Sequence, residues 1–368
     1  MIINKIETFA NQDICMVRIE TDRGEGIGMT APFSADITAQ VLHRLAAPIV
    51  LGREFDDFKQ IADEIITQQY KFLGTFVTRA AAGIDTALWD AAAKAKEMTV
   101  ADFAGRKTEK PINLYGSSML RNPIPIHSEA ERLNGLREKY GFKCFKIHPG
   151  IPVGDDKDFY EGCTKDFIAD VRKSLPSDVG LWVDVNGNYS VEKAIEMAHY
   201  IKDTGCDLYE EPCPYWKLDD VKKVHEECKK IGLPLAAGEQ DYMDASWDRM
   251  INEHIVDVAQ PDLLYIGGFS RSLRLAEKCA AAGIPVTPHT SNQSPIFVFG
   301  LSYMSVVDNP YHVLECGIEY GEWEHAPYLN PPVISGGAAD ILPGSGWGLE
   351  LNPQWLAKSQ YQVSKYKG

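Results

Sequence analysis

From about residue 112 onward, short apolar runs alternate with amphipathic helical stretches, and this alternation limits the possible folds more than any other feature. The runs lie at residues 112–117, 143–147, 180–185, 207–210, 234–238, 255–259, 284–288 and 312–315. Stretches such as 191–205 and 270–283 have helical spacing and separate most of the runs. Strands joined by helical crossovers predict a (β/α)8 barrel, in which the last crossovers are the least regular.

The chain before residue 112 has a different pattern. Its periodic segments are two strand-like runs at 2–10 and 14–20 and three helical stretches at 35–48, 55–70 and 79–98. Residues 20–32 are rich in glycine and are expected to form a connector. We therefore expect an α+β module of about a hundred residues, against which the Gly/Pro-rich tail from about residue 336 packs.

Composition excludes several classes of partner. The formal net charge of −15 argues against a surface for nucleic acid or an anionic membrane. No apolar run approaches the ~18 residues of a membrane span, and the N-terminus lacks the pattern of a signal peptide. The eight cysteines are scattered without a CxxC pair, as is typical of reduced thiols. These features predict a cytoplasmic protein that binds neither nucleic acid nor membrane.

Three acidic residues close three successive apolar runs and predict a metal site. Asp184, Glu210 and Glu239 are separated by 26 and 29 residues, about one strand and one helix each. The ends of parallel barrel strands meet at one face, so these carboxylates should converge there. Converging carboxylates repel one another unless a cation lies between them, and oxygen-only ligation suits Mg²⁺. Glu211 is adjacent to Glu210, and we expect only one of the two to point inward.

Residues two apart on a strand face the same way, which places further polar side chains near this site. On the second predicted strand, GFKCFKIHPG, Lys146 and His148 share the inner wall with Cys144. A single lysine at a strand end usually lies in solvent, but the neighbouring histidine and the acids favour an inward Lys146. On the third strand, Asn186 shares the parity of Asp184 and is expected to orient a ligand or the substrate.

A second pair lies on the sixth and seventh strands. Asp262 and His289 are 27 residues apart, again one strand–helix unit, so they should be lateral neighbours. A carboxylate bonded to one imidazole nitrogen fixes the tautomer and makes the other nitrogen more basic. An isolated histidine is more often a buried structural residue, and the aspartate one unit earlier favours the catalytic interpretation. On the eighth strand, Glu315 faces the same cavity as an acid or a hydrogen-bond donor.

These residues suit the removal of a proton next to a carboxylate. A cation bound to a carboxylic acid acidifies the neighbouring carbon and stabilises the enediolate that forms. Candidate bases lie on two walls, Lys146 with His148 on one and the Asp262–His289 pair on the other. Two bases allow racemisation, whereas one base and one acid allow β-elimination of a hydroxyl group.

The same residues resemble those of a known family. The motifs AAGIDTALWDAAAKA, GFKCFKIH, WVDVNGN, YEEP, AAGE, QPD, IGG, TPH and LEC run in order over nearly the whole chain. In order and spacing they are similar to the mandelate racemase subgroup of the enolase superfamily, within its mandelate racemase/muconate lactonizing enzyme group.

The resemblance implies a fold, a cofactor and a set of residue roles. The fold class would be α/β, a modified (β/α)8 TIM barrel at residues 111–335 under an N-terminal α+β capping domain at 1–110, completed by the tail 336–368. Mg²⁺ would be bound by Asp184, Glu210 and Glu239. An Asp262–His289 dyad and Lys146 would act in catalysis, with Glu315 on the substrate carboxylate or enediolate. Loops at 20–32 and near 50–75 would cover the cavity, and the protein would form homo-oligomers, dimers or octamers.

The sequence departs from the family pattern on the second strand. Where the family often has Lys-x-Lys, this chain has Lys146 and His148. A histidine in the second position favours a Mg²⁺-dependent dehydratase of a small-molecule sugar acid, an aldonate or aldarate, that yields a 2-keto-3-deoxy acid. His148 and His289 would then divide the roles of acid and base in an order that the sequence leaves open. The alternatives are a racemase or epimerase with the same enediolate, and a barrel without catalytic activity.

Overall fold

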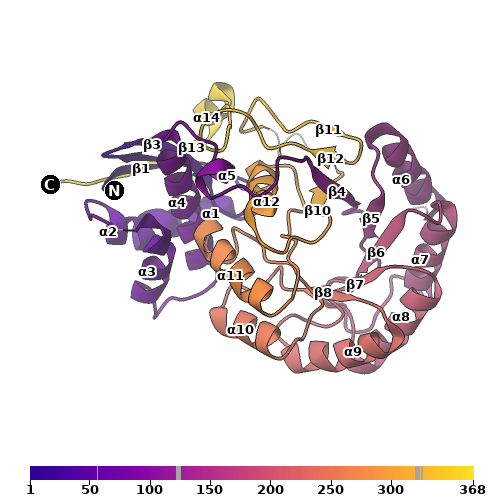
Figure 1. Ribbon diagram of the computed structural model, residues 1–368. Helices are drawn as coiled ribbons and strands as arrows, with labels where there is room; N and C mark the ends of the chain where they lie inside the picture. The colour runs from indigo at the N-terminus through magenta and orange to yellow at the C-terminus, as the bar shows by residue number, and fades with distance from the viewer. Residues whose placement is uncertain (56, 122–125, 320–323, 325) are drawn as a thin grey trace.

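The computed structural model describes residues 1–368 except 56, 122–125, 320–323 and 325, and it also leaves the side chains of 126 and 127 undescribed. Figure 1 shows a smaller module that contains both chain termini beside a ring of strands and helices. Among the described residues, no helix is both long and apolar enough to cross a membrane. All eight cysteines are buried and free.

The smaller module is built on a four-stranded antiparallel sheet. Its strands are β1 (Ile3–Ala10), β2 (Cys15–Thr21), β3 (Gly24–Met29) and β13 (Gln360–Lys365), in the order β13-β1-β2-β3. The last strand comes from the C-terminal tail and pairs with β1 from Lys5–Lys365 to Ala10–Gln360. The tail therefore contributes the fourth strand of this sheet.

The prediction of a connector at 20–32 was wrong, because Gly24–Met29 forms the strand β3. The strand packs on α4 (Thr75–Lys94) at very short range. A Cβ atom at Gly26 would lie 2.0 Å from the carbonyl oxygen of Ala87, and one at Gly28 would lie 2.4 Å from Thr86 Oγ1. The glycines therefore permit close packing of helix on sheet rather than a flexible loop.

The remaining helices of this module fall in the predicted segments, except for α5, which no segment predicted. They are α1 (Ala35–Val41), the π-helical turn η1 (Leu42–Ala46), α2 (Ala47–Val50), the 3-10 turn η2 (Phe58–Gln60), α3 (Ile61–Gln68) and α5 (Val100–Phe103). The long helix α4 is buried over most of its length because it contacts both the sheet and the barrel. Its alanine-rich sequence allows this approach from two sides.

The ring is a parallel barrel. Its strands are β4 (Ile112–Ser117), β5 (Cys144–Ile147), β6 (Gly180–Asp184), β7 (Leu208–Glu210), β8 (Leu235–Ala237), β9 (Val258–Ala259) and β10 (Leu314–Gly317). The seventh predicted strand is reduced to single bridges from Val286 to Ala259 and to Pro310. Since β10 also pairs with β4, hydrogen bonds continue around the ring.

Helices surround the strands, as Figure 1 shows. They are α6 (Ile126–Tyr140), α7 (Cys163–Ser174), α8 (Val191–Asp203), α9 (Leu218–Ile231), α10 (Asp244–Asn252), α11 (Phe269–Ala281) and α12 (Pro295–Val306). The sequence explains their ends: the Ser190 side chain accepts from Lys193 N at the start of α8, and Gly232 closes α9 with φ 66°. Three short elements of the tail follow: β11 (Ile334–Ser335), β12 (Ala338–Ala339) and α14 (Pro353–Lys358).

Two layers of side chains fill the barrel and position the site. The lower layer is apolar and consists of Tyr115, Cys144, Trp182, Leu208, Ala236, Val258 and Val313. The residues two positions further along most of these strands are polar and buried: Ser117, Lys146, Asp184, Glu210, Gln260 and Glu315. Because side chains alternate along a strand, each strand that seals the core also carries a polar group to the carboxyl end.

Two aspartates of α4 bind the module to the rest of the molecule. Asp85 accepts a hydrogen bond from Ser270 N at the start of α11, which lacks a side-chain cap of its own. Burial raises the pKa of Asp85 to about 7. Asp90 accepts from Ile27 N and Trp347 N, which joins the helix to β3 and to the tail.

Candidate active site

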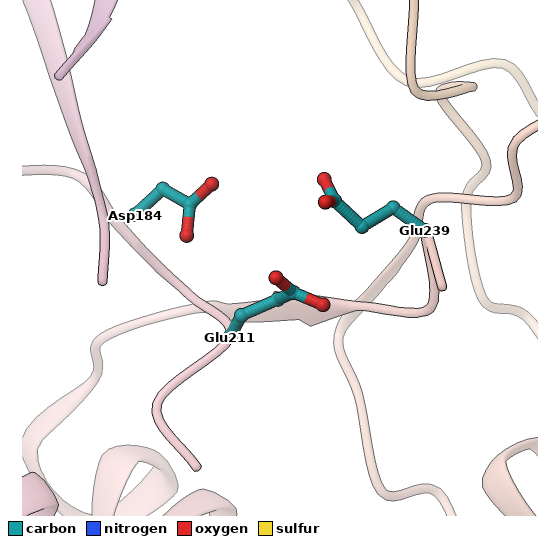
Figure 2. Close-up of side chains that lie close together, drawn as sticks. All are labelled: Asp184, Glu211 and Glu239. Carbon is teal, nitrogen blue, oxygen red and sulfur yellow. The ribbon is translucent and has the colours of Figure 1, made fainter. Parts of the chain in front are cut away.

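Three carboxylates converge at the carboxyl end of the barrel, as Figure 2 shows. Asp184, Glu211 and Glu239 are all buried, and each offers an oxygen within 4.8 Å of the others. Asp184 ends β6, Glu211 follows β7, and Glu239 lies two residues beyond β8. Three neighbouring strands thus supply one acid each.

The acid that joins this cluster from the end of β7 is Glu211, where the sequence predicted Glu210. In a strand that continued past Glu210, only one of the two residues would point inward. The strand instead ends at Glu210, and Glu211 has a left-handed backbone with φ 43°. This turn brings Glu211 to the mouth of the barrel while Glu210 remains in the layer below it.

Glu210 belongs to a buried charge network around Lys146. Lys146 Nζ lies 2.5 Å from Glu210 Oε1 and 3.0 Å from Glu315 Oε1, and Gln260 donates to the other oxygen of Glu210 at 2.8 Å. Burial favours the neutral amine, but the charges of Glu210 and Glu315 raise the pKa of Lys146 well above its usual value. Glu315 also accepts from Thr290 N at 2.8 Å. The inward position expected for Lys146 is therefore found, with two carboxylates as its partners.

Asp184 is held by its own loop and by His148, the residue that follows β5. Asn186 donates to it from the backbone at 2.8 Å and from the side chain at 3.0 Å, and also reaches Glu211 Oε2 at 3.3 Å. His148 Nε2 lies 3.0 Å from Asp184 Oδ2, and His148 Nδ1 contacts the carbonyl oxygen of Ser118. Burial alone would raise the pKa of Asp184, but His148 and Lys146 hold it well below the ordinary value.

The histidine of the seventh strand has the partner that the spacing predicted. His289 Nδ1 lies 2.8 Å from Asp262 Oδ2, and Asp262 Oδ1 accepts from Leu264 N and Tyr265 N. This leaves Nε2, which lies 3.6 Å from Glu239 Oε2, on the side of the carboxylate cluster. Burial opposes protonation, but the charges of Glu239, Glu315 and Asp262 raise the pKa of His289 well above its usual value.

A cavity of about 410 Å³ opens above these residues. Its lining includes His148, Asn186, Glu211, Glu239 and His289, together with Met119, Arg121, Pro152, Val153, Gly187, Pro214, Tyr215, Trp216, Gln240, Tyr265 and Ser291. The expected contributions from 20–32 and 50–75 are not among these residues, all of which lie between 119 and 291. The N-terminal module approaches the site instead through α4, where Arg79 lies 3.7 Å above the ring centre of Tyr265.

Sequence reasoning missed several groups of the site. Arg121 lies on the loop after β4, where no periodicity marks it. Ser118 is held through its side chain by Glu129, Arg132 and Glu319, and its carbonyl group contacts His148. Gln260 lies two residues after Val258 of β9, and this parity with an inward residue is the sequence signal that indicates its position.

The cluster fits a hard divalent cation such as Mg²⁺. All three side chains are oxygen donors, and within the described part of the chain neither Glu211 nor Glu239 has a lysine or arginine partner. Burial raises the pKa of Glu211 well above its usual value, and the charges of Glu239 and Asp184 raise it further. A bound cation would remove this repulsion.

Two family models together match most of the chain. The description "Enolase C-terminal domain-like" applies to residues 128–355, and "Mandelate racemase / muconate lactonizing enzyme, N-terminal domain" applies to residues 3–105. The chain belongs to the enolase superfamily. The resemblance to mandelate racemase and muconate lactonizing enzyme is confirmed by the second of these models. The relatives of this chain include enzymes that are named dehydratases.

Three proteins, one enzyme and two crystal structures, illustrate what the chain is similar to. Arabinonate dehydratase of Saccharolobus solfataricus is 26% identical over 313 residues, which cover 81% of this chain and 78% of the relative. A crystal structure from Roseobacter denitrificans, provisionally named a racemase, is 40% identical with a TM-score of 0.95 over the full length of both chains. L-talarate dehydratase of Polaromonas sp. JS666, crystallised with Mg and L-glucarate, has a TM-score of 0.84 at 19% identity over 100% of this chain and 99% of its own, and so shows the fold.

Proposed function

We propose that this superfamily member is a Mg²⁺-dependent dehydratase of sugar acids. The observation that carries the proposal is the pair of unlike histidines on two walls of one cavity beside the carboxylate cluster. His289 has one ring nitrogen bonded to Asp262 and the other directed to the cluster, whereas both nitrogens of His148 face acceptor oxygens. A histidine that directs one ring nitrogen to the cluster suits the role of base, and the histidine on the other wall suits that of proton donor.

The reaction is the loss of water from a 2,3-dihydroxy acid. When bound at Asp184, Glu211 and Glu239, the cation would neutralise charge on the substrate carboxylate and so acidify the proton on carbon 2. His289 Nε2 takes this proton, and its charge is balanced by Asp262. The electron pair of the C–H bond forms the carbon–carbon double bond, the C3–O bond breaks, and the hydroxyl group leaves as water after it receives a proton from a histidine.

Lys146, which is paired with Glu315, contacts the acid group of the substrate in this proposal. Lys146 and Glu315 lie at the bottom of the mouth, 3.0 Å from each other. Lys146 would donate to the carboxylate oxygens as negative charge accumulates there. Since Lys146 is fully buried between Glu210 and Glu315, its position favours this role over that of a second base.

Loss of water yields an enol that becomes a 2-keto-3-deoxy acid. The test is incubation of the purified protein with aldonates and aldarates of defined configuration in the presence of Mg²⁺, followed by detection of 2-keto acid with semicarbazide. We expect keto acid from at least one acid of this panel, and none after the metal is removed by a chelator. Complete absence of keto acid from the whole panel would contradict the proposal.

A racemase or epimerase is the second candidate, favoured by the provisional name of the 40%-identical Roseobacter protein. Both reactions remove the same proton, but only racemisation returns a proton to carbon 2 of an otherwise unchanged molecule. The two are separated by NMR in deuterated water. Exchange at carbon 2 without loss of water would replace the dehydratase by the second candidate.

A further inference from the structure

Arg121 is placed to recognise part of the substrate that lies away from the metal site. Among the described residues that line the cavity, it alone carries a lysine or arginine side chain. Its Nη2 donates to Asn186 Oδ1 at 2.5 Å. Its Nη1 is buried and has no hydrogen-bond partner in the part of the chain that the structure describes. A buried guanidinium donor without a partner is costly and indicates an acceptor that the protein itself does not supply.

The contacts of Asn186 show where this donor lies. Asn186 Nδ2 donates to Asp184 at 3.0 Å and to Glu211 at 3.3 Å, whereas its Oδ1 accepts from Arg121. Arg121 is therefore separated from the carboxylate cluster by one side chain. A substrate with its acid group at the cluster would extend past Asn186 toward Arg121.

The lining of the cavity suits a chain of carbons with hydroxyl groups. Tyr215 and Trp216 both line it, with their rings edge to face at 5.1 Å, and Trp216 is 59% exposed. Aromatic faces pack well on C–H groups, and polar groups at the two ends of the cavity fix orientation. Hydroxyl groups offer a guanidinium single contacts, whereas a carboxylate accepts two parallel hydrogen bonds from it.

We propose that Arg121 binds the distal carboxylate of the substrate, so that the enzyme prefers aldarates, which carry two carboxylates, to aldonates, which carry one. This inference rests on the proposed function and makes it narrower. It assigns the choice of substrate to the loop after the first barrel strand rather than to the N-terminal module.

The test measures binding separately from turnover. The His289→Asn enzyme is used because it does not convert its ligands. With Mg²⁺ present, its affinities for hexarates and for the hexonates of matching configuration are measured by calorimetry. We expect the hexarate to bind at least about tenfold more tightly than the hexonate. Adding Arg121→Gln should weaken hexarate binding by about 10–100-fold and hexonate binding by less than about threefold, with Arg121→Lys intermediate.

Arg79→Gln is the matched control, because this guanidinium lies on Tyr265 outside the cavity lining. It should leave the ratio of the two affinities unchanged. Mn²⁺ binding followed by electron paramagnetic resonance should change less than about threefold in Arg121→Gln, which shows that the cluster beside Asn186 is intact.

Three results would overturn the assignment. Arg121→Gln could weaken hexarate and hexonate binding by the same factor, or it could leave both affinities unchanged. Alternatively, Arg79→Gln could change the ratio of the two affinities as much as Arg121→Gln does. If acid sugars are dehydrated while one of these results holds, only the role of Arg121 fails. If no hexarate or hexonate binds and none is dehydrated, the proposed function fails with it.

Discussion

Glu210 and Glu211 are consecutive in the chain, yet they have different partners. Glu210 is paired with Lys146 in the buried layer of the barrel, and Glu211 joins Asp184 and Glu239 at the mouth. The difference is produced by one left-handed residue at the end of β7. A positive φ at a glutamate is unfavourable by roughly 1 kcal/mol, and such conformations concentrate at functional sites. The backbone at this position therefore determines which carboxylate is available to a cation.

We predict opposite effects for the two substitutions. Glu211→Gln should lower Mn²⁺ affinity by at least about tenfold, because it removes a ligand charge, whereas Glu210→Gln should lower it less than about fivefold. Glu210→Gln should instead reduce the free energy of unfolding by about 2–4 kcal/mol, because buried Lys146 loses a charged partner. Electron paramagnetic resonance and urea unfolding measure these effects. A larger loss of Mn²⁺ affinity in Glu210→Gln than in Glu211→Gln would make Glu210 the ligand from β7.

His289 is expected to act on protons and not on the cation. His289→Asn should lower kcat by at least about 10³-fold while Mn²⁺ affinity changes less than about threefold. His199→Asn is the control, because this exposed histidine contacts only Glu227 among the pairs described, at 3.2 Å. Steady-state kinetics of keto-acid formation provides the measurement. A near-normal rate in His289→Asn would remove the residue from the reaction.

At the scale of elements, regular strands carry the chemistry and irregular connections adjust it. Strands β5, β6 and β7 place Lys146, Asp184 and Glu210 at the positions that alternation predicts. The seventh strand is reduced to bridges at Val286, yet its continuation still brings His289 to Asp262. The position of a side chain at the barrel mouth therefore depends more on where a strand ends than on how long it is.

The joint between β1 and β13 depends on Glu7. This buried carboxylate accepts from Arg18 Nε at 2.7 Å and from Tyr361 Oη at 2.6 Å. Burial would raise the pKa of Glu7, but these two hydrogen bonds lower it to about 2, from an ordinary value of 4.5. A lowered pKa in the folded state means that the stabilisation is complete above pH 4.5 and is lost as the pH falls toward 2.

Glu7→Gln should therefore lower the free energy of unfolding by about 2 kcal/mol at pH 7. Near pH 2 the variant and the parent should be equally stable, as thermal unfolding across the pH range would record. Glu20→Gln is the control, because its half-exposed pair with Lys5 should contribute less than about 0.5 kcal/mol. If the loss of unfolding free energy in Glu7→Gln were independent of pH, it would contradict this account of the joint.

For the whole molecule, the C-terminal tail and α4 hold the two parts together. Trp347 is buried, its Nε1 donates to the carbonyl of Thr86 at 2.9 Å, and its ring packs on Phe269 and Phe299 of α11 and α12. Asp90 Oδ1 accepts a hydrogen bond from Trp347 N at 2.7 Å. The barrel and the N-terminal module thus share a common apolar core, and we expect them to unfold together.

Trp347→Ala should lower the free energy of unfolding by about 3–5 kcal/mol, because it leaves a large cavity at this contact. Calorimetry should show one transition for the parent protein and a broader or divided transition for the variant. Tyr70→Ala, at a side chain that is 71% exposed, should change stability by less than about 0.5 kcal/mol. Two separate transitions in the parent would show that the parts fold independently.

Much of the fold and part of the site followed from local periodicity. Strand alternation and the strand–helix repeat predicted the barrel, the inward Lys146 and Asp184, and the Asp262–His289 contact. Both signals are local because a regular backbone repeats its geometry from residue to residue. The domain limits at 110 and 335 and the oligomeric state remain predictions.

Tertiary structure alone decided the rest, at positions where the backbone stops repeating. Glu211 entered the cluster through a left-handed turn, Arg121 reached the cavity from a loop, and β3 formed because its glycines fit against α4. No periodic pattern encodes these positions, because each depends on segments distant in the chain that pack against it. The sequence therefore determined the barrel and most of its inward residues, whereas packing selected the third acid of the carboxylate cluster and the arginine that lines the cavity.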